Sequence, residues 1–181
     1  SVSSYGDGNF VTTWYDENRD DIYARNYNIL GDPIGGEYRV NTHTGHTQRN
    51  PEVTSLEDGS YVITWGSRYQ DAGSSYGVYG QLYDSQGVEV GGEFRVNAET
   101  QGSQQDPSVT ALADGGFLVC WESAGQDGNG YGIYGHRFDA SGAPVTFASS
   151  AQSADITGST LEAVRLFGDI EAGDSYTLTL D

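Results

Sequence analysis

Three copies of one sequence unit occupy most of the chain and constrain its fold more than any other feature. The copies open with VSSYGDGNFVTTW at residues 2–14, VTSLEDGSYVITW at residues 53–65 and VTALADGGFLVCW at residues 109–121. Their tryptophans, Trp14, Trp65 and Trp121, are 51 and then 56 positions apart. Self-similarity at such a period is typical of arrays in which each repeat is one small unit that packs on its neighbours.

Each unit predicts four short β-strands. A first apolar segment leads into an Asp-Gly pair such as Asp58–Gly59, which favours a tight hairpin, and a second apolar segment ends at the tryptophan. The third strand contains the sequence IYG or VYG, and the fourth is EYRVN at residues 37–41 or EFRVN at residues 93–97. The second strand is apolar or uncharged on both faces, which predicts sheets stacked on sheets.

We therefore predict an all-β protein of three propeller-blade-like, four-stranded repeats followed by a short β C-terminal tail. A β-sandwich array is the alternative. The predicted units are residues 1–50, residues 51–106 and a truncated third unit at 107–146, with a linker and a C-terminal strand segment at 147–181. Because propellers have about four to eight blades, we expect self-association, or further repeats of the same polypeptide, to cover the end faces.

The charge balance excludes several classes of partner. The formal net charge is −18, with 26 acidic residues against 8 basic ones, and every basic residue is arginine. Such an acidic protein lacks the clustered positive charge that nucleic acids and anionic lipids require. No apolar segment reaches the roughly 18 residues of a membrane span, so membrane insertion is not expected. The single cysteine, Cys120, forms no intrachain disulfide and is expected to be buried.

Two acidic loops are candidate calcium sites. Asp127 and Asn129 alternate in QDGNG like the first ligands of a calcium loop, and the YDENRDD segment places Asp16 and Asp20 in a richer carboxylate cluster. A solvated turn is the simpler interpretation of both loops. Calcium is the one candidate cofactor. The pair His43 and His46 lacks further zinc ligands, so we interpret it as part of a polar linking loop.

The aromatic residues suggest packing first and binding second. The repeated position of the three tryptophans favours a structural role for them. Tyr69 and Tyr76 lie in or beside a variable loop, where an exposed ring can stack on a sugar, and they are the candidate residues of a lectin-like alternative. No nucleophile elbow or recognisable glycosidase context is present, so no catalytic residue is assigned and the protein is not expected to be an enzyme. A glycosidase built on a propeller is the third alternative, after the structural and the lectin-like module.

The third unit, DGGFLVCWESAGQDGNGYGIYGHRFDASGAPV, together with GGEFRVN at the joins, resembles tandem repeats of very large secreted bacterial proteins of the RTX type, the hemolysin-type calcium-binding adhesins and toxins. The resemblance covers residues 1–145. It implies a secreted or cell-surface location and a non-catalytic structural or adhesive module, calcium-stabilised and acting in cell adhesion. Cell-surface glycans are a candidate partner, and a lectin-like propeller module is the alternative function. The G-G-x-G-x-D nonapeptide is absent, so the resemblance assigns no calcium ligand.

Overall fold

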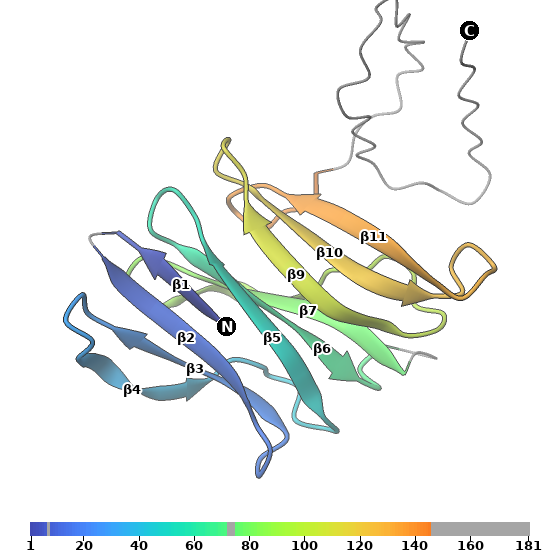
Figure 1. Ribbon diagram of the computed structural model, residues 1–181, viewed down its shortest axis with the longest axis horizontal. Helices are drawn as coiled ribbons and strands as arrows, with labels where there is room; N and C mark the ends of the chain where they lie inside the picture. Colours follow the sequence, from blue (N-terminus) through green and yellow to red (C-terminus); the bar gives the residue numbers. More distant parts are fainter. Residues whose placement is uncertain (7, 72–74, 146–181) are drawn as a thin grey trace, which may run out of the picture.

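The computed structural model describes residues 1–145 except 7 and 72–74, and these residues form antiparallel β-strands joined by short loops (Figure 1). In this part of the chain, no helix has the length and apolar character that a membrane crossing requires. The strands, in chain order, are β1 (Val2–Tyr5), β2 (Asn9–Asp16), β3 (Asp21–Tyr27), β4 (Pro33–Arg39), β5 (Gln48–Ser55), β6 (Tyr61–Arg68), β7 (Tyr76–Tyr83), β8 (Glu89–Arg95), β9 (Gln104–Ala111), β10 (Phe117–Ala124) and β11 (Tyr131–Phe138).

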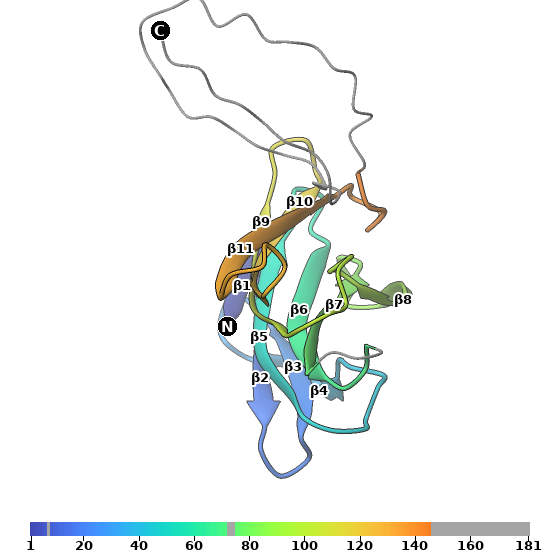
Figure 2. The ribbon, with the colours of Figure 1, turned by 90° about the vertical axis from the view of Figure 1, so that its right-hand side faces the viewer.

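The strands form three sheets, each built from strands that are consecutive in the sequence. The first sheet has the order β1-β2-β3-β4 and the second β5-β6-β7-β8, while the third, within the described residues, comprises β9, β10 and β11. β1 contacts β5, and β5 contacts β9, so the first strand of each sheet is its innermost strand (Figures 1 and 2). The three sheets therefore stand side by side as blades, each presenting its first strand to the middle of the array.

Short side chains and glycines make the hairpin turns. The Asp84 carboxylate accepts hydrogen bonds from the backbone N–H groups two and four residues further along, and Asp139 does the same in the third unit, at 2.8 to 3.0 Å. Such side-chain bonds fold the backbone back on itself. In the Asp-Gly turns, Gly59 and Gly115 both have φ of 85°, a conformation that glycine adopts without steric cost.

Apolar side chains fill the spaces between neighbouring sheets. The cluster between the first and second sheets consists of Tyr5, Val11, Ile22, Ala24 and Val40 from the first, and Val53, Tyr61, Ile63, Trp65, Tyr79 and Tyr83 from the second. The cluster between the second and third sheets consists of Leu56, Val62, Val78, Leu82 and Val96 from the second, and Phe117, Val119, Trp121 and Phe138 from the third. In both interfaces a mainly aliphatic face packs against the aromatic face of the following sheet.

The three tryptophans occupy matched positions. Each pairs in register with a tyrosine of the third strand: Trp14 with Tyr23, Trp65 with Tyr79, and Trp121 with Tyr134. Trp65 and Trp121 are buried between sheets, whereas Trp14 is half-buried, because no sheet among the described residues lies on its side of the first blade.

In the first two blades, buried side-chain hydrogen bonds connect the end of the fourth strand to the start of the third. The Asn97 side chain accepts a hydrogen bond from the Val78 N–H at 2.7 Å and donates to the Asp71 carboxylate at 2.9 Å. Asn41 makes the matching bonds in the first sheet, both at 2.7 Å. The asparagine that ends each RVN sequence therefore fixes the outer strand of its blade.

The structure confirms the predicted all-β fold of propeller-like blades. It argues against the β-sandwich array, because the three sheets pack in series and each presents an innermost strand to the same middle region. The strand segment predicted at residues 147–181 lies outside the described residues.

Candidate functional site

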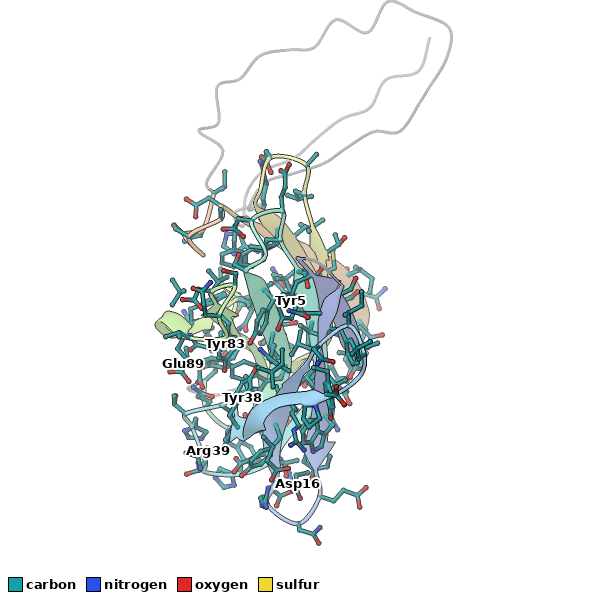
Figure 3. All side chains as sticks on the ribbon, turned by 90° about the vertical axis from the view of Figure 1, so that its left-hand side faces the viewer. Tyr5, Asp16, Tyr38, Arg39, Tyr83 and Glu89 are labelled. Carbon is teal, nitrogen blue, oxygen red and sulfur yellow. The ribbon has the colours of Figure 1, made fainter. Side chains whose placement is uncertain are left out.

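The array of blades has two faces, which we call proximal and distal. The proximal face is the end at which β5 and β9 begin, and it also carries the loops that follow β2, β6 and β10. The register places these loops together, because Gln48 at the start of β5 pairs with Ser67 near the end of β6. In Figure 3, Asp16 and Arg39 lie toward the proximal face, and Tyr5 lies toward the distal face.

All the non-glycine residues of the described chain whose backbone is left-handed, with positive φ, lie on the proximal face. They are Asp20, His46, Asn50, Tyr69 and Asp106, with φ between 52° and 73°. The distal turns place glycine at their left-handed positions, for example Gly31 and Gly87. A left-handed backbone is strained for most side chains, above all for a bulky one such as tyrosine, and this strain gathers at functional sites.

Two of these residues form a matched pair on neighbouring innermost strands. Asn50 in β5 and Asp106 in β9 each precede a proline, have φ of 52° and 53°, and sit at an irregularity in strand pairing. The Asn50 amide donates a hydrogen bond to the Asp106 carboxylate, and both residues are exposed. Bulges of this kind turn a side chain out of the regular strand direction.

Asp106 and Glu52 are the acidic residues of the innermost strands that the structure describes. The Ser1 hydroxyl donates to the Glu52 carboxylate at 2.9 Å, which places Glu52 against the innermost part of the first blade. The innermost strands β5 and β9 thus bring one carboxylate each to the middle of the array. Sequence reasoning missed both acids. The available signal was the aligned Asn50-Pro51 and Asp106-Pro107, at which a repeated position changes from amide to acid.

Tyr69 presents an exposed ring on the same face. Its side chain is 51% exposed, the His46 ring meets it edge-on at 5.0 Å between centroids, and the Arg68 guanidinium lies 4.8 Å from its centroid. An aromatic ring with polar neighbours is suited to stacking on the apolar face of a sugar. Tyr76, the other tyrosine predicted to contact a sugar, is buried, with the Arg49 guanidinium 3.8 Å above its ring.

The predicted calcium ligands are engaged within their own loops. Asp16 pairs with Arg19 at 3.2 Å and accepts the Asn18 N–H, and Asp20 accepts the Tyr15 hydroxyl at 2.6 Å. This bond to Asp20 raises the pKa of Tyr15 to about 12.

In the third blade, the Asp127 carboxylate accepts the Asn129 N–H at 3.0 Å in an exposed turn. No group of three His, Cys, Asp or Glu side chains placed to hold a metal occurs in the described part of the chain. Calcium at these loops therefore stays a prediction from the sequence.

Several solved structures have a similar fold. A protein of unknown function from Dyadobacter fermentans DSM 18053 is 15% identical with a TM-score of 0.52, and the match covers 82% of this chain and 54% of that one. The GH43 endo-arabinanase of Bacillus licheniformis is 17% identical, with a TM-score of 0.46 and coverages of 79% and 54%. For the endo-1,5-alpha-L-arabinanase of Thermotoga petrophila RKU-1 the values are 13%, 0.44, 85% and 43%.

The chain spans about half the length of these solved proteins. No family model and no curated protein matches it.

These comparisons correct the functional predictions. The resemblance to RTX-type repeats was wrong, because the matched structures include propellers of glycoside hydrolases and no family model supports that family. The non-catalytic structural or adhesive function, its lectin-like alternative and the calcium-binding character taken from the family are wrong as well. The exclusion of an enzyme was also wrong, since glycoside hydrolases occur among the proteins of similar fold. The prediction that the chain is not an enzyme rested on the lack of a contiguous motif, whereas carboxylates on separate blades can come together in space without forming one.

Proposed function

We propose that this chain is part of a carbohydrate-processing β-propeller that binds a saccharide on its proximal face. The observation that carries the proposal is the gathering of every described left-handed non-glycine residue, Asp106 and Tyr69 among them, on that one face. The distal turns use glycine at their left-handed positions, where it carries no steric cost, whereas the proximal face uses glycine at only some of them, namely Gly102, Gly125, Gly128 and Gly130. Asp, Asn and His tolerate this conformation, so the backbone strain is concentrated at Tyr69, and the retention of a tyrosine there favours a binding and reaction site.

Glu52 and Asp106 are the candidate acids of the reaction. Hydrolysis of a glycosidic bond commonly uses two carboxyl groups, one that protonates the leaving oxygen and one that acts as base or nucleophile. The innermost strands β5 and β9 supply one acid each. The bond from Asn50 holds the Asp106 carboxylate in one orientation, as an acid that must meet a substrate atom requires.

Tyr69 is the candidate stacking residue for a neighbouring sugar unit. Its ring is exposed, while His46 and Arg68 restrict its position and offer hydrogen-bonding groups at its edge. A ring held in this way loses little conformational freedom on binding. A polymeric saccharide substrate also favours an extracellular location, where salt screens the repulsion within a chain of net charge −18.

The test is release of reducing sugar ends from a panel of plant and bacterial polysaccharides by the whole chain and three variants. We expect Glu52→Gln and Asp106→Asn each to lower the rate by about a hundredfold or more. The matched control is Glu57→Gln, because Glu57 is exposed in the distal β5–β6 turn and should leave the rate unchanged. A chain that cleaves no polysaccharide, or that cleaves one equally well in all variants, would contradict the proposal.

A further inference from the structure

The first blade ends in an aromatic face that no sheet covers among the described residues. We call it the aromatic end face, and it comprises Val2, Phe10, Trp14, Tyr23 and Tyr27. The same register positions in the second blade are Val53, Tyr61, Trp65, Tyr79 and Tyr83, and all of these are buried against the first blade. Val2 is 63% exposed, whereas its counterpart Val53 is 6% exposed.

The third blade ends in the complementary face. We call it the aliphatic end face, and it comprises Leu118, Cys120, Tyr131 and Ile133 on β10 and β11. Ile133 is 73% exposed, whereas its counterparts in the earlier blades, Ile22 and Val78, are completely buried under the next blade. A large aliphatic side chain in this position is therefore suited to an interface between blades.

We propose that a second copy of this chain covers these faces, the aromatic end face of one copy packing on the aliphatic end face of the other. The chain already contains this interface twice, between its first and second blades and between its second and third. In the second of these, His136 bonds across the interface to the Val96 carbonyl at 3.0 Å. Arg25 occupies the matching position on the aromatic end face, as the pairing of Thr12 with Arg25 and of Val119 with His136 shows.

Blade number and charge both favour two copies. Propellers close with about four to eight blades, so two copies of the three blades that the structure describes fall within this range, whereas one copy or three copies of them fall outside it. A head-to-tail interface closes into a ring when the rotation between subunits allows it. The two end faces also carry opposite charges. Arg25 lies on the aromatic end face and Glu122 on the aliphatic end face, where Arg137 is already bonded to Asp114.

The test measures the native mass of the whole chain by light scattering at about 0.15 M salt, which screens its net negative charge. We expect about twice the chain mass of 19.4 kDa. Ile133→Glu and Val2→Glu each place a charge on one end face and should each give a monomer. Both residues are exposed in the single chain, so its fold should survive, which circular dichroism checks. Leu30→Glu is the matched control, because Leu30 is 82% exposed in the β3–β4 turn, away from both faces, and should leave the dimer intact.

Mixing the two monomeric variants decides the geometry. The Ile133→Glu copy keeps its aromatic end face and the Val2→Glu copy keeps its aliphatic one, so an equimolar mixture should regain one interface and form a dimer. If the unmodified chain stays at 19.4 kDa, the proposal is overturned and the faces belong to further blades of a longer polypeptide. An open-ended polymer, or a mixture that stays monomeric, would overturn it too.

Discussion

The side-chain amide of Asn50 donates a hydrogen bond to the carboxylate of Asp106 and thereby links the innermost strands of the second and third blades. The backbone of both residues adopts the left-handed conformation. They occupy the same position of the repeat, which holds an amide in the second blade and an acid in the third. This difference makes the contact attractive, because two acids in these positions would repel each other.

The variant Asn50→Asp should therefore be less stable than the natural chain at pH 7, by about 1 kcal/mol for like charges facing each other across strands. The loss should disappear as the pH falls below about 4, where carboxylates become protonated. Urea unfolding at both pH values measures it. Asn50→Gly removes the amide without adding charge, so its stability difference from the natural chain should change less with pH than that of Asn50→Asp. Equal pH dependence of the two variants would contradict the repulsion.

Tyr69 should show opposite effects on stability and on binding. Its φ of 58° is strained for a tyrosine, whereas asparagine tolerates that conformation. Tyr69→Asn should therefore raise the free energy of unfolding by about 1 kcal/mol and weaken binding of the saccharide. Thermal unfolding and the KM for the polysaccharide substrate measure the two effects. Tyr69→Phe is the control, because it keeps the ring and should preserve binding. An unchanged KM in the Tyr69→Asn variant would contradict the assignment of this ring to the saccharide-binding site.

The matched tryptophans should differ in their contributions to stability. Trp65 is fully buried between two blades, so Trp65→Ala should lower the free energy of unfolding by about 3 to 5 kcal/mol, as for other buried large aromatics. Trp14 is half-buried on the aromatic end face, and Trp14→Ala should cost clearly less in the monomeric Val2→Glu background. Urea unfolding of both variants in that background makes the comparison. Equal losses would mean that another part of the chain covers Trp14.

The repeat made most of the fold predictable from sequence, because the interactions that form each blade join residues close together in the sequence. Asp-Gly turns, apolar strands and the RVN endings act within a few residues, so their pattern predicts each blade. The site is different, because Glu52 and Asp106 are 54 positions apart in the sequence and lie on neighbouring innermost strands only through the packing of β5 against β9. Tyr76 illustrates the same limit. It lies at the edge of a variable loop, but Arg49 from the neighbouring strand covers its ring, and nothing near Tyr76 in the sequence indicates that contact.

A cluster of two buried tyrosines in the second blade and a partly buried one in the first should make the protein sensitive to alkali. The hydroxyls of Tyr38 and Tyr61 are 2.8 Å apart, and the Tyr61 and Tyr83 rings stack with centroids 5.1 Å apart. Figure 3 shows Tyr38 and Tyr83 in the same part of the molecule. Burial raises the pKa of all three hydroxyls above that of an exposed tyrosine. A raised pKa in the folded state stabilises the fold fully below about pH 10, and this stabilisation is lost as the pH rises further.

Tyr83 provides the sharpest test of this cluster. Its hydroxyl is buried and has no hydrogen-bond partner among the described residues, so Tyr83→Phe should raise the free energy of unfolding by about 1 kcal/mol. The variant should also lose less stability between pH 9 and pH 11, because one buried ionisable group is gone. Tyr61→Phe is the matched control. It loses bonds to Tyr38 and Asn26, so it should be destabilised by about 1 kcal/mol at pH 7, although its alkaline loss should be reduced as well. Urea unfolding across this pH range measures both variants, and a Tyr83→Phe chain less stable than the natural one would show that the hydroxyl has a stabilising partner.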